Sequence, residues 1–214
     1  GGAELLDDFS ALMKKTENRK NIHLRGKNYY QKLLDTYPDH SYITLSSIDL
    51  KARLEDLQAQ LTKTLKEAEK FTEKTKPGKI ENNQQEQKRL QEEIDFLQDK
   101  ISQGATVVPL SGTLVLEYGK TSENIYAGMD EEYRRYQPAI ITWYETAKHA
   151  FERGADWQNM GGIENDLKGG LYSFKSKFNP TIEEFAGEFN LPTNPLYHLS
   201  NLAYTIRKKL RSKH

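Results

Sequence analysis

Residues 50–102, LKARLEDLQAQLTKTLKEAEKFTEKTKPGKIENNQQEQKRLQEEIDFLQDKIS, decide how this chain is organised. The segment consists almost entirely of charged residues, Gln, Leu and Ile. Its apolar residues recur every three or four positions, which is typical of amphipathic helices. They form two series: Leu54, Leu57, Leu61 and Leu65, then Leu90, Ile94, Leu97 and Ile101. Pro77-Gly78 lies between them and combines a helix breaker with a turn former. We therefore predict two helices that reverse at Pro77-Gly78.

The two apolar series mirror each other about this predicted turn. Folding the segment there sets Leu54 against Ile101. Successive pairs toward the turn are Leu57 with Leu97, Leu61 with Ile94 and Leu65 with Leu90. This symmetry predicts an antiparallel coiled-coil hairpin. Nearer the turn, Ala68 and Phe71 face Gln residues, so we expect the seam to weaken outward and the end to fray.

The flanking sequence mixes helical and strand patterns. Helices are predicted at 3–17, 26–36, 138–154 and 195–214, where Pro138 starts and Gly154 stops the third. Strands are predicted at 41–47, 106–119, 123–129, 155–160 and 183–189, the second being a strand pair or one bulged strand and the fourth buried. We predict one α/β domain, residues 1–49 and 103–214, that carries residues 50–102 as a protruding arm.

Composition limits the function classes. Lys plus Arg and Asp plus Glu are both 31, so no global field steers the chain to nucleic acid or membrane, and a basic site must be local. Cysteine is absent, which excludes disulfides and thiolate chemistry and fits a cytoplasmic protein. No apolar run reaches the roughly 18 residues of a membrane span. The chain starts at Gly1-Gly2 without Met, so we expect a piece of a longer protein.

Common catalytic motifs are missing. The sequence contains no GxxxxGK[ST], GxGxxG, HExxH or GxSxG, and its five His have no metal-ligand spacing. We therefore expect no metal and no cofactor.

Three stretches could bind or react. In IHLRGKNYYQKL, Arg25 and Tyr29 lie at a loop-to-helix junction suited to phosphate or carboxylate, or they form an ordinary helix start. In GGLYSFKSKF, Phe174 and Phe178 share a helix face flanked by Lys175 and Lys177, which are either directed cations or solvated surface.

The third stretch is the basic end IRKKLRSKH. It could contact tRNA phosphates or anionic lipid, or simply complement a helix dipole. Its candidate contacts are Arg207, Lys208, Lys209, Arg211 and Lys213.

The chain resembles the second half of the Fem/MurM family of tRNA-dependent peptidyltransferases that build peptidoglycan cross-bridges. The resemblance is carried by ELLDDFSALMKKTENRKNIHLRGKNYYQKLLD, VPLSGTLVLEYG, NIYAGMDEEYRRYQPAIITWYETAKHAFERGADWQNMGG and GGLYSFKSKFNPTIEEFAGEFNLPTNPLY, in the family's order from about residue 3 to the end. It implies a GNAT-like domain, of the acyl-CoA N-acyltransferase type, with a helical hairpin arm and with the family's first domain missing.

The resemblance also implies site residues. The lysine of the F-K pair, here Phe174-Lys175, contributes to catalysis beside the transferred acyl group. The arginine of R-x-x-x-Y, here Arg25 with Tyr29, holds acceptor phosphates, and Tyr126 in NIYAGM lines the acceptor site. Lys177 has no such role. No general base is evident in this chain, so an acid of the missing domain or the substrate would take the amine proton.

The implied reaction is transfer of Ala, Ser or Gly from aminoacyl-tRNA to the stem-peptide amine of a lipid-linked muropeptide precursor, at the inner face of the membrane. The partners are then this precursor, the tRNA and the missing domain, and the arm could dock tRNA, a partner protein or a second copy. Two alternatives stay open. One is a non-catalytic scaffold that works through the arm; the other is a small-molecule acetyltransferase, against which the missing Q/R-x-x-G-x-G/A loop counts.

Overall fold

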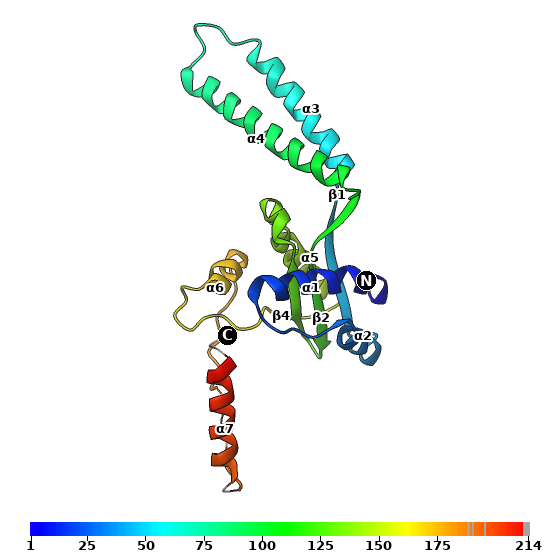
Figure 1. The fold of residues 1–214 in the computed structure, drawn as a ribbon, viewed down its shortest axis with the longest axis vertical. Coiled ribbons are helices and arrows are strands. Elements are labelled where there is room, and N and C mark those ends of the chain that lie inside the picture. The colour runs from blue at the N-terminus through cyan, green and yellow to red at the C-terminus, as the bar shows by residue number, and fades with distance from the viewer. Residues whose placement is uncertain (188, 190, 195, 212–214) are drawn as a thin grey trace. The chain divides into compact units, whose positions relative to one another are not determined.

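The computed structural model describes residues 1–187, 189, 191–194 and 196–211, and the side chains to Arg207. It divides into two units, Gly1–Phe178 and Asn179–His214 (Figure 1). The predicted division into a domain and an arm stays a prediction.

The first unit is built on a mixed sheet. Its strands lie in the order β1 (Ser41–Asp49), β2 (Val107–Tyr118), β3 (Thr121–Met129) and β4 (Trp157–Asn159). The first three pair antiparallel, and β4 runs parallel to β3. The sequence offered two readings of residues 106–119, and the structure has one long strand, with register shifts against both neighbours.

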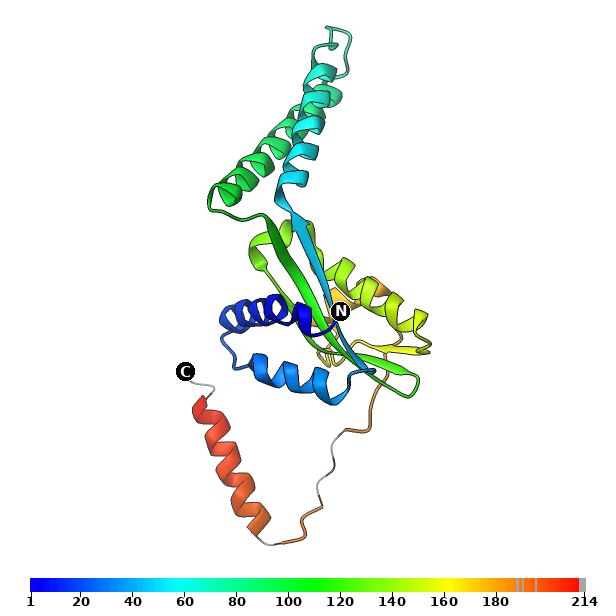
Figure 2. The ribbon, with the colours of Figure 1, turned by 90° about the vertical axis from the view of Figure 1, so that its right-hand side faces the viewer.

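Helices cover both faces of this sheet (Figure 2). On one face lie α1 (Leu6–Lys20), which follows a short 3₁₀ turn at Ala3–Leu5, and α2 (Lys27–Thr36). Their apolar side chains form a core with the sheet: Leu6, Phe9, Met13, Tyr30, Leu34, Ile43 and Leu114. Gly128 permits the close approach of α1, because a Cβ there would lie 3.0 Å from Met13 Sδ and 3.1 Å from the Leu12 backbone.

The opposite face is covered by α5 (Pro138–Glu152). Its sheet-facing residues are small and spaced four apart: Thr142, Thr146 and Ala150. The Thr146 and Thr113 hydroxyls are 2.8 Å apart across this interface, and the Thr146 hydroxyl also donates to the Thr142 carbonyl at 2.6 Å, so both buried hydroxyls have a hydrogen-bond partner. As predicted, α5 starts at Pro138, and the chain leaves it through Gly154 at φ +95°.

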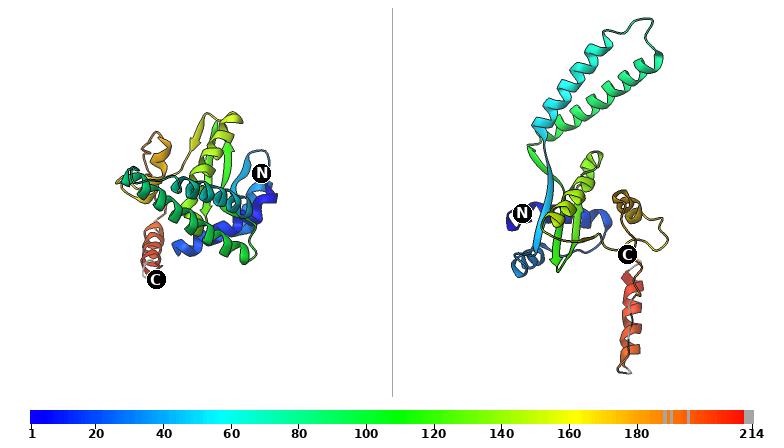
Figure 3. Two further views of the ribbon diagram at one scale, coloured as in Figure 1. Left: turned by 90° about the horizontal axis from the view of Figure 1, so that it is seen from above. Right: turned by 180° about the vertical axis from the view of Figure 1, so that it is seen from behind.

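The two predicted arm helices are present as α3 (Leu50–Ala68) and α4 (Pro77–Ser102), which lie side by side (Figures 1 and 3). Asp49 caps α3 by accepting from the backbone N–H groups of Lys51 and Ala52 at 3.0 Å each. The seam contains the predicted residues Leu54, Leu57, Leu61, Leu90, Ile94, Leu97 and Ile101.

The outer end of the arm differs from the prediction. Leu65 is 44% exposed, so the seam weakens earlier than its leucine spacing suggests. The chain reverses over residues 69–76, and Pro77-Gly78 opens α4 instead of forming the turn. The physical reason is that proline suits the first helical position, where its missing N–H costs nothing.

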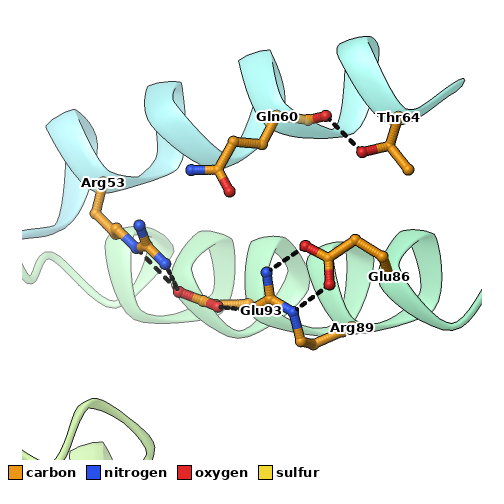
Figure 4. A network of polar contacts seen from close by, with 6 residues as sticks. All are labelled: Arg53, Gln60, Thr64, Glu86, Arg89 and Glu93. Atoms are coloured by element: carbon orange, nitrogen blue, oxygen red, sulfur yellow. Dashed lines mark hydrogen bonds and ion pairs between the residues drawn. The ribbon is translucent and has the colours of Figure 1, made fainter. Parts of the chain in front are cut away.

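The root of the arm carries a buried charge. The Arg53 side chain donates two hydrogen bonds to Glu93 Oε1, at 3.0 and 2.7 Å, and Arg89 links Glu93 to Glu86 (Figure 4). Tyr133, from the 3₁₀ segment Glu131–Tyr136, packs into the arm's apolar seam. These contacts join the arm to the rest of the first unit.

Two strand predictions need correction. Residues 155–160 contain only the three-residue edge strand β4, whose Trp157 is 61% exposed, so this strand is not buried. The described residues of 183–189 form no strand, and Phe185 and Phe189 are exposed. An apolar pattern forms a strand only where a sheet edge is available to pair with it. The second unit contains α7 (Leu196–Arg211), as predicted. No described helix is long and apolar enough to cross a membrane.

Candidate functional site

Lys175 is the most buried charged side chain in the FKSKF stretch. It ends the short helix α6 (Gly170–Lys175), which continues as a 3₁₀ turn over Ser176–Phe178. Lys175 is only 7% exposed, whereas Lys177 is exposed. Burying an ammonium group is costly unless it is paired, so the position of Lys175 calls for an explanation.

Aromatic rings fix the backbone beside Lys175. Phe174 packs edge-on against Trp143 of α5, with ring centroids 5.3 Å apart, and against Phe178 at 5.6 Å. The predicted inner-face pair of phenylalanines is therefore present. Lys175 Nζ lies over the face of the Trp143 ring, 5.7 Å from the ring centroid. The face of an indole ring attracts a cation, so Trp143 partly compensates for the lost water.

The loop that follows β4 supplies the remaining partner. Lys175 Nζ donates a hydrogen bond to the Gly162 carbonyl at 2.7 Å. The preceding residue, Gly161, has a φ of +73°, a backbone conformation that favours glycine. Burial lowers the pKa of Lys175, and the Glu164 carboxylate acts in the opposite direction. Of the three ammonium hydrogens, the described contacts use one.

Glu164 clamps this loop to α6. Its carboxylate accepts hydrogen bonds from the backbone N–H groups of Leu171, at 3.1 Å, and Tyr172, at 3.0 Å. The backbone N–H groups of Glu164 itself, Leu171 and Tyr172 lower the pKa of this carboxyl group. Gly169 is required for the clamp, because a Cβ there would lie 2.0 Å from Glu164 Cδ. We call Lys175, Phe174, Trp143, Gly162 and Glu164 the Lys175 pocket.

The three residues predicted to bind the acceptor also come together. The Arg25 guanidinium lies 5.2 Å from the Tyr29 ring centroid, and the Tyr29 and Tyr126 centroids are 6.2 Å apart. Tyr30 packs against Tyr126 at 5.0 Å. Burial is the main cause that raises the pKa of Tyr126, and it raises that of Tyr30 to about 12. These phenols are therefore neutral at physiological pH. We call Arg25, Tyr29, Tyr30 and Tyr126 the tyrosine cluster.

The pocket and the cluster lie on different faces of the sheet. Tyr126 packs with the core under α1 and α2, whereas Phe174 and Lys175 contact Trp143 of α5. The predicted residues thus form two separate groups. A ligand that contacted both the Lys175 pocket and the tyrosine cluster would have to extend around the sheet or be bound in addition by residues outside these two groups.

Two residues of the pocket were missed by sequence reasoning. In the sequence, Trp143 looks like any other residue of α5. Its only signal is that it lies next to the face of small buried residues, Thr142 and Thr146, that packs against the sheet. Glu164 carried a signal, since an acidic residue shortly before a Gly-Gly helix start can cap that helix.

The remaining site predictions can be placed briefly. Among the described residues, no group of three His, Cys, Asp or Glu could hold a metal ion. Arg207 is exposed on α7. The side chains of Lys208, Lys209 and Arg211 and the whole of Lys213 lie outside what the structure describes.

The sequence is similar to a known protein family and to named enzymes. The sequence matches the FemAB family over residues 1–205. It is 29% identical over 211 residues to a lipid II:glycine glycyltransferase of Staphylococcus epidermidis, and 30% identical over 208 residues to the one of Staphylococcus saprophyticus. In both cases the match covers 92% of this chain and 50% of the relative, so the chain spans about half the length of these relatives.

A solved structure shares the fold. The crystal structure of FemX superposes with a TM-score of 0.56 at 23% sequence identity, and the match covers 83% of this chain and 47% of that one. This likeness concerns the fold alone.

Proposed function

The chain belongs to the FemAB family, and on that premise we propose that it is the second half of an aminoacyltransferase. This enzyme transfers Ala, Ser or Gly from aminoacyl-tRNA to the stem-peptide amine of a lipid-linked peptidoglycan precursor. It needs no cofactor and works in the cytoplasm at the inner face of the membrane. The observation that carries the proposal is a buried lysine, Lys175, held in place in a chain similar to glycyltransferases. The fold is proposed to be GNAT-like, with the arm as an inserted coiled coil.

The reaction is the aminolysis of an ester. The nitrogen of the acceptor amine attacks the ester carbonyl carbon of aminoacyl-tRNA, and negative charge develops on the carbonyl oxygen. When the tetrahedral intermediate collapses, the C–O bond to the terminal ribose breaks, an amide forms, and the ribose oxygen takes up a proton. The barrier is lowered by any fixed positive group beside the developing oxyanion.

Lys175 is suited to this role for two reasons. Its Nζ is directed by the Gly162 carbonyl and the Trp143 ring, so it does not have to be ordered during the reaction. It also lies among aromatic side chains, where a charge interaction is stronger than in water. Removing one such donor typically raises the barrier by roughly 3 to 4 kcal/mol. Phe174 is proposed to fix its direction.

The tyrosine cluster is proposed to hold the acceptor. Arg25 would pair with its phosphates, and Tyr29 and Tyr126 would line the same place. Because the cluster lies on the other sheet face, the phosphates would be bound away from the reacting amine, which a long lipid-linked peptide permits. The missing first domain is proposed to complete the site and to supply the acceptor of the amine proton.

The test is an aminoacyl transfer assay with the complete protein that contains this chain. A mixture of labelled aminoacyl-tRNAs and a lipid-linked muropeptide are supplied together. We expect one label, Ala, Ser or Gly, to be transferred to the stem-peptide amine. Absence of transfer from every charged tRNA would contradict the proposal and favour a scaffold that works through the arm.

A further inference from the structure

The outer end of the arm is strongly basic. Residues 63–79, here called the arm tip, contain six lysines and three glutamates, a net charge of +3. All six lysines are exposed: Lys63, Lys66, Lys70, Lys74, Lys76 and Lys79. Among the described contacts of the arm tip, one ion pair forms, between Lys79 and Glu67 at 2.9 Å. Most of this positive charge therefore faces solvent.

The arm tip is also hollowed. An open cleft of about 700 Å³ is lined by Lys63, Lys66, Lys70 and Lys79, with Phe71 at its wall. The Lys79 ammonium lies 5.4 Å from the centroid of the Phe71 ring. The field of these cations reaches Glu67, whose pKa is lowered chiefly by the hydrogen bond from Lys79 and further by Lys63 and Lys70. Such a cleft suits a group with several phosphate or carboxylate oxygens.

The shaft below the arm tip has the opposite charge. Between residues 81 and 100, α4 carries six acidic residues and three basic ones, a net charge of −3. Several of these pair with one another along the helix, among them Glu86 with Arg89 and Lys88 with Glu92. The arm is therefore positive at its outer end and negative along α4. This segregation decides between two kinds of polyanion.

A nucleic acid follows a stripe of positive charge, because its phosphates repeat every few ångströms along the strand. Lying along this arm, it would meet the acidic residues of α4. A flat anionic surface that touches the arm end-on meets only the arm tip. The charges thus fit a surface better than a strand.

We propose that the arm tip docks end-on onto an anionic membrane surface through its exposed lysines. Lysines near such a surface contribute roughly 1 kcal/mol each, within about a Debye length. Phe71 gives the contact a small apolar element. The proposal is compatible with the proposed function, which brings the protein to a lipid-linked substrate, but it rests on the charges of the arm.

Vesicle co-sedimentation tests it directly, with the full chain and no substrate. One set of vesicles contains phosphatidylcholine alone, and the other contains phosphatidylcholine with phosphatidylglycerol. We expect binding to the second set only. The double variant Lys66→Glu, Lys70→Glu should bind at least tenfold more weakly, on the scale of roughly fivefold for each lysine near the surface. Wild-type binding should also fall steeply with added salt.

A matched control reverses two exposed lysines elsewhere, Lys32→Glu and Lys148→Glu, which change the net charge by the same amount. This control should retain more binding than the arm-tip variant. Equal losses in both variants, or full binding by the arm-tip variant, would overturn the proposal. Binding of a single-stranded RNA oligonucleotide that depends on Lys66 and Lys70, without vesicle binding, would replace it by a nucleic-acid role. This experiment measures binding and not aminoacyl transfer. Its result can therefore be interpreted even if the proposed reaction is wrong.

Discussion

The Lys175 pocket and the arm tip use the same side chain in opposite ways. The pocket buries one ammonium against a carbonyl oxygen and an indole ring. The arm tip exposes six ammonium groups to solvent. A buried charge interacts strongly over a short distance and depends on geometry, whereas exposed charges act together and are screened by salt. The pocket is therefore suited to chemistry and the arm tip to attraction between surfaces.

The largest change to the pocket, short of removing Lys175, should come from Gly169→Ala. The added Cβ would lie 2.0 Å from Glu164 Cδ, so the Glu164 side chain must move away, and its hydrogen bonds to the backbone of α6, the helix that carries Lys175, are lost. A displacement of about 1 Å in a catalytic group can reduce the rate roughly 100-fold. We expect a loss of that order in kcat for aminoacyl transfer by the complete protein.

Gly170→Ala is the matched control, because a Cβ at that position meets nothing within 4 Å. Its kcat should stay near that of the wild type. Equal losses in both alanine variants would mean that α6 is sensitive to any substitution. Such a result would contradict a specific role of the Glu164 clamp in catalysis.

A smaller effect is expected from Glu164→Gln. Glutamine keeps one oxygen that can accept from the Leu171 or Tyr172 N–H, but it loses the charge that strengthens both hydrogen bonds. We expect kcat to fall about three- to tenfold with little change in acceptor KM. Glu164→Ala should lose more, and the partial rescue by Gln would identify Glu164 as a positioning residue. Identical activity of both variants and the wild type would contradict the clamp.

The smallest effect concerns folding and pH. Burial lowers the pKa of Lys175 below its unfolded value, so the unfolded state binds more protons in the interval between the two. Above the unfolded pKa, Lys175 is neutral in both states, and its burial carries no cost for a charge. This stability is lost as the pH falls through the folded pKa, because the charged form must then be buried. Urea unfolding of the wild type and of Lys175→Met should give a difference in unfolding free energy that favours the wild type more as pH rises toward 10.5. A difference that is constant with pH would show that Lys175 is not desolvated.

The sequence predicted the regular parts of the molecule well. The arm seam was predictable because each leucine series repeats at the helical period and the two series mirror each other. The start of α5 was marked by Pro138. The chain reversal was placed a few residues late, because Pro77 serves a helix start as readily as a turn. Residues 183–189 had a strand pattern, but pairing depends on a sheet edge that local sequence does not specify.

The site was predictable only in part. The pairing of Phe174 with Phe178 follows from helical spacing. Tyr29 and Tyr126 were named from the family resemblance, and the 6.2 Å contact between their rings is seen only in the structure. The depth of Lys175, compared with the exposure of Lys177, depends on the loop that returns from β4 and on Trp143 of α5. These segments are separated from α6 along the chain, so their contacts arise from tertiary packing.

We propose that Lys175 supports transfer because its charge is buried and directed. The most direct measurement compares Lys175→Met with Lys177→Met in the complete protein, under saturating acceptor, in single-turnover transfer from aminoacyl-tRNA. We expect a loss of roughly 100-fold or more for Lys175→Met, with acceptor binding preserved and Lys177→Met near the wild type. Equal rates for the two variants would contradict it.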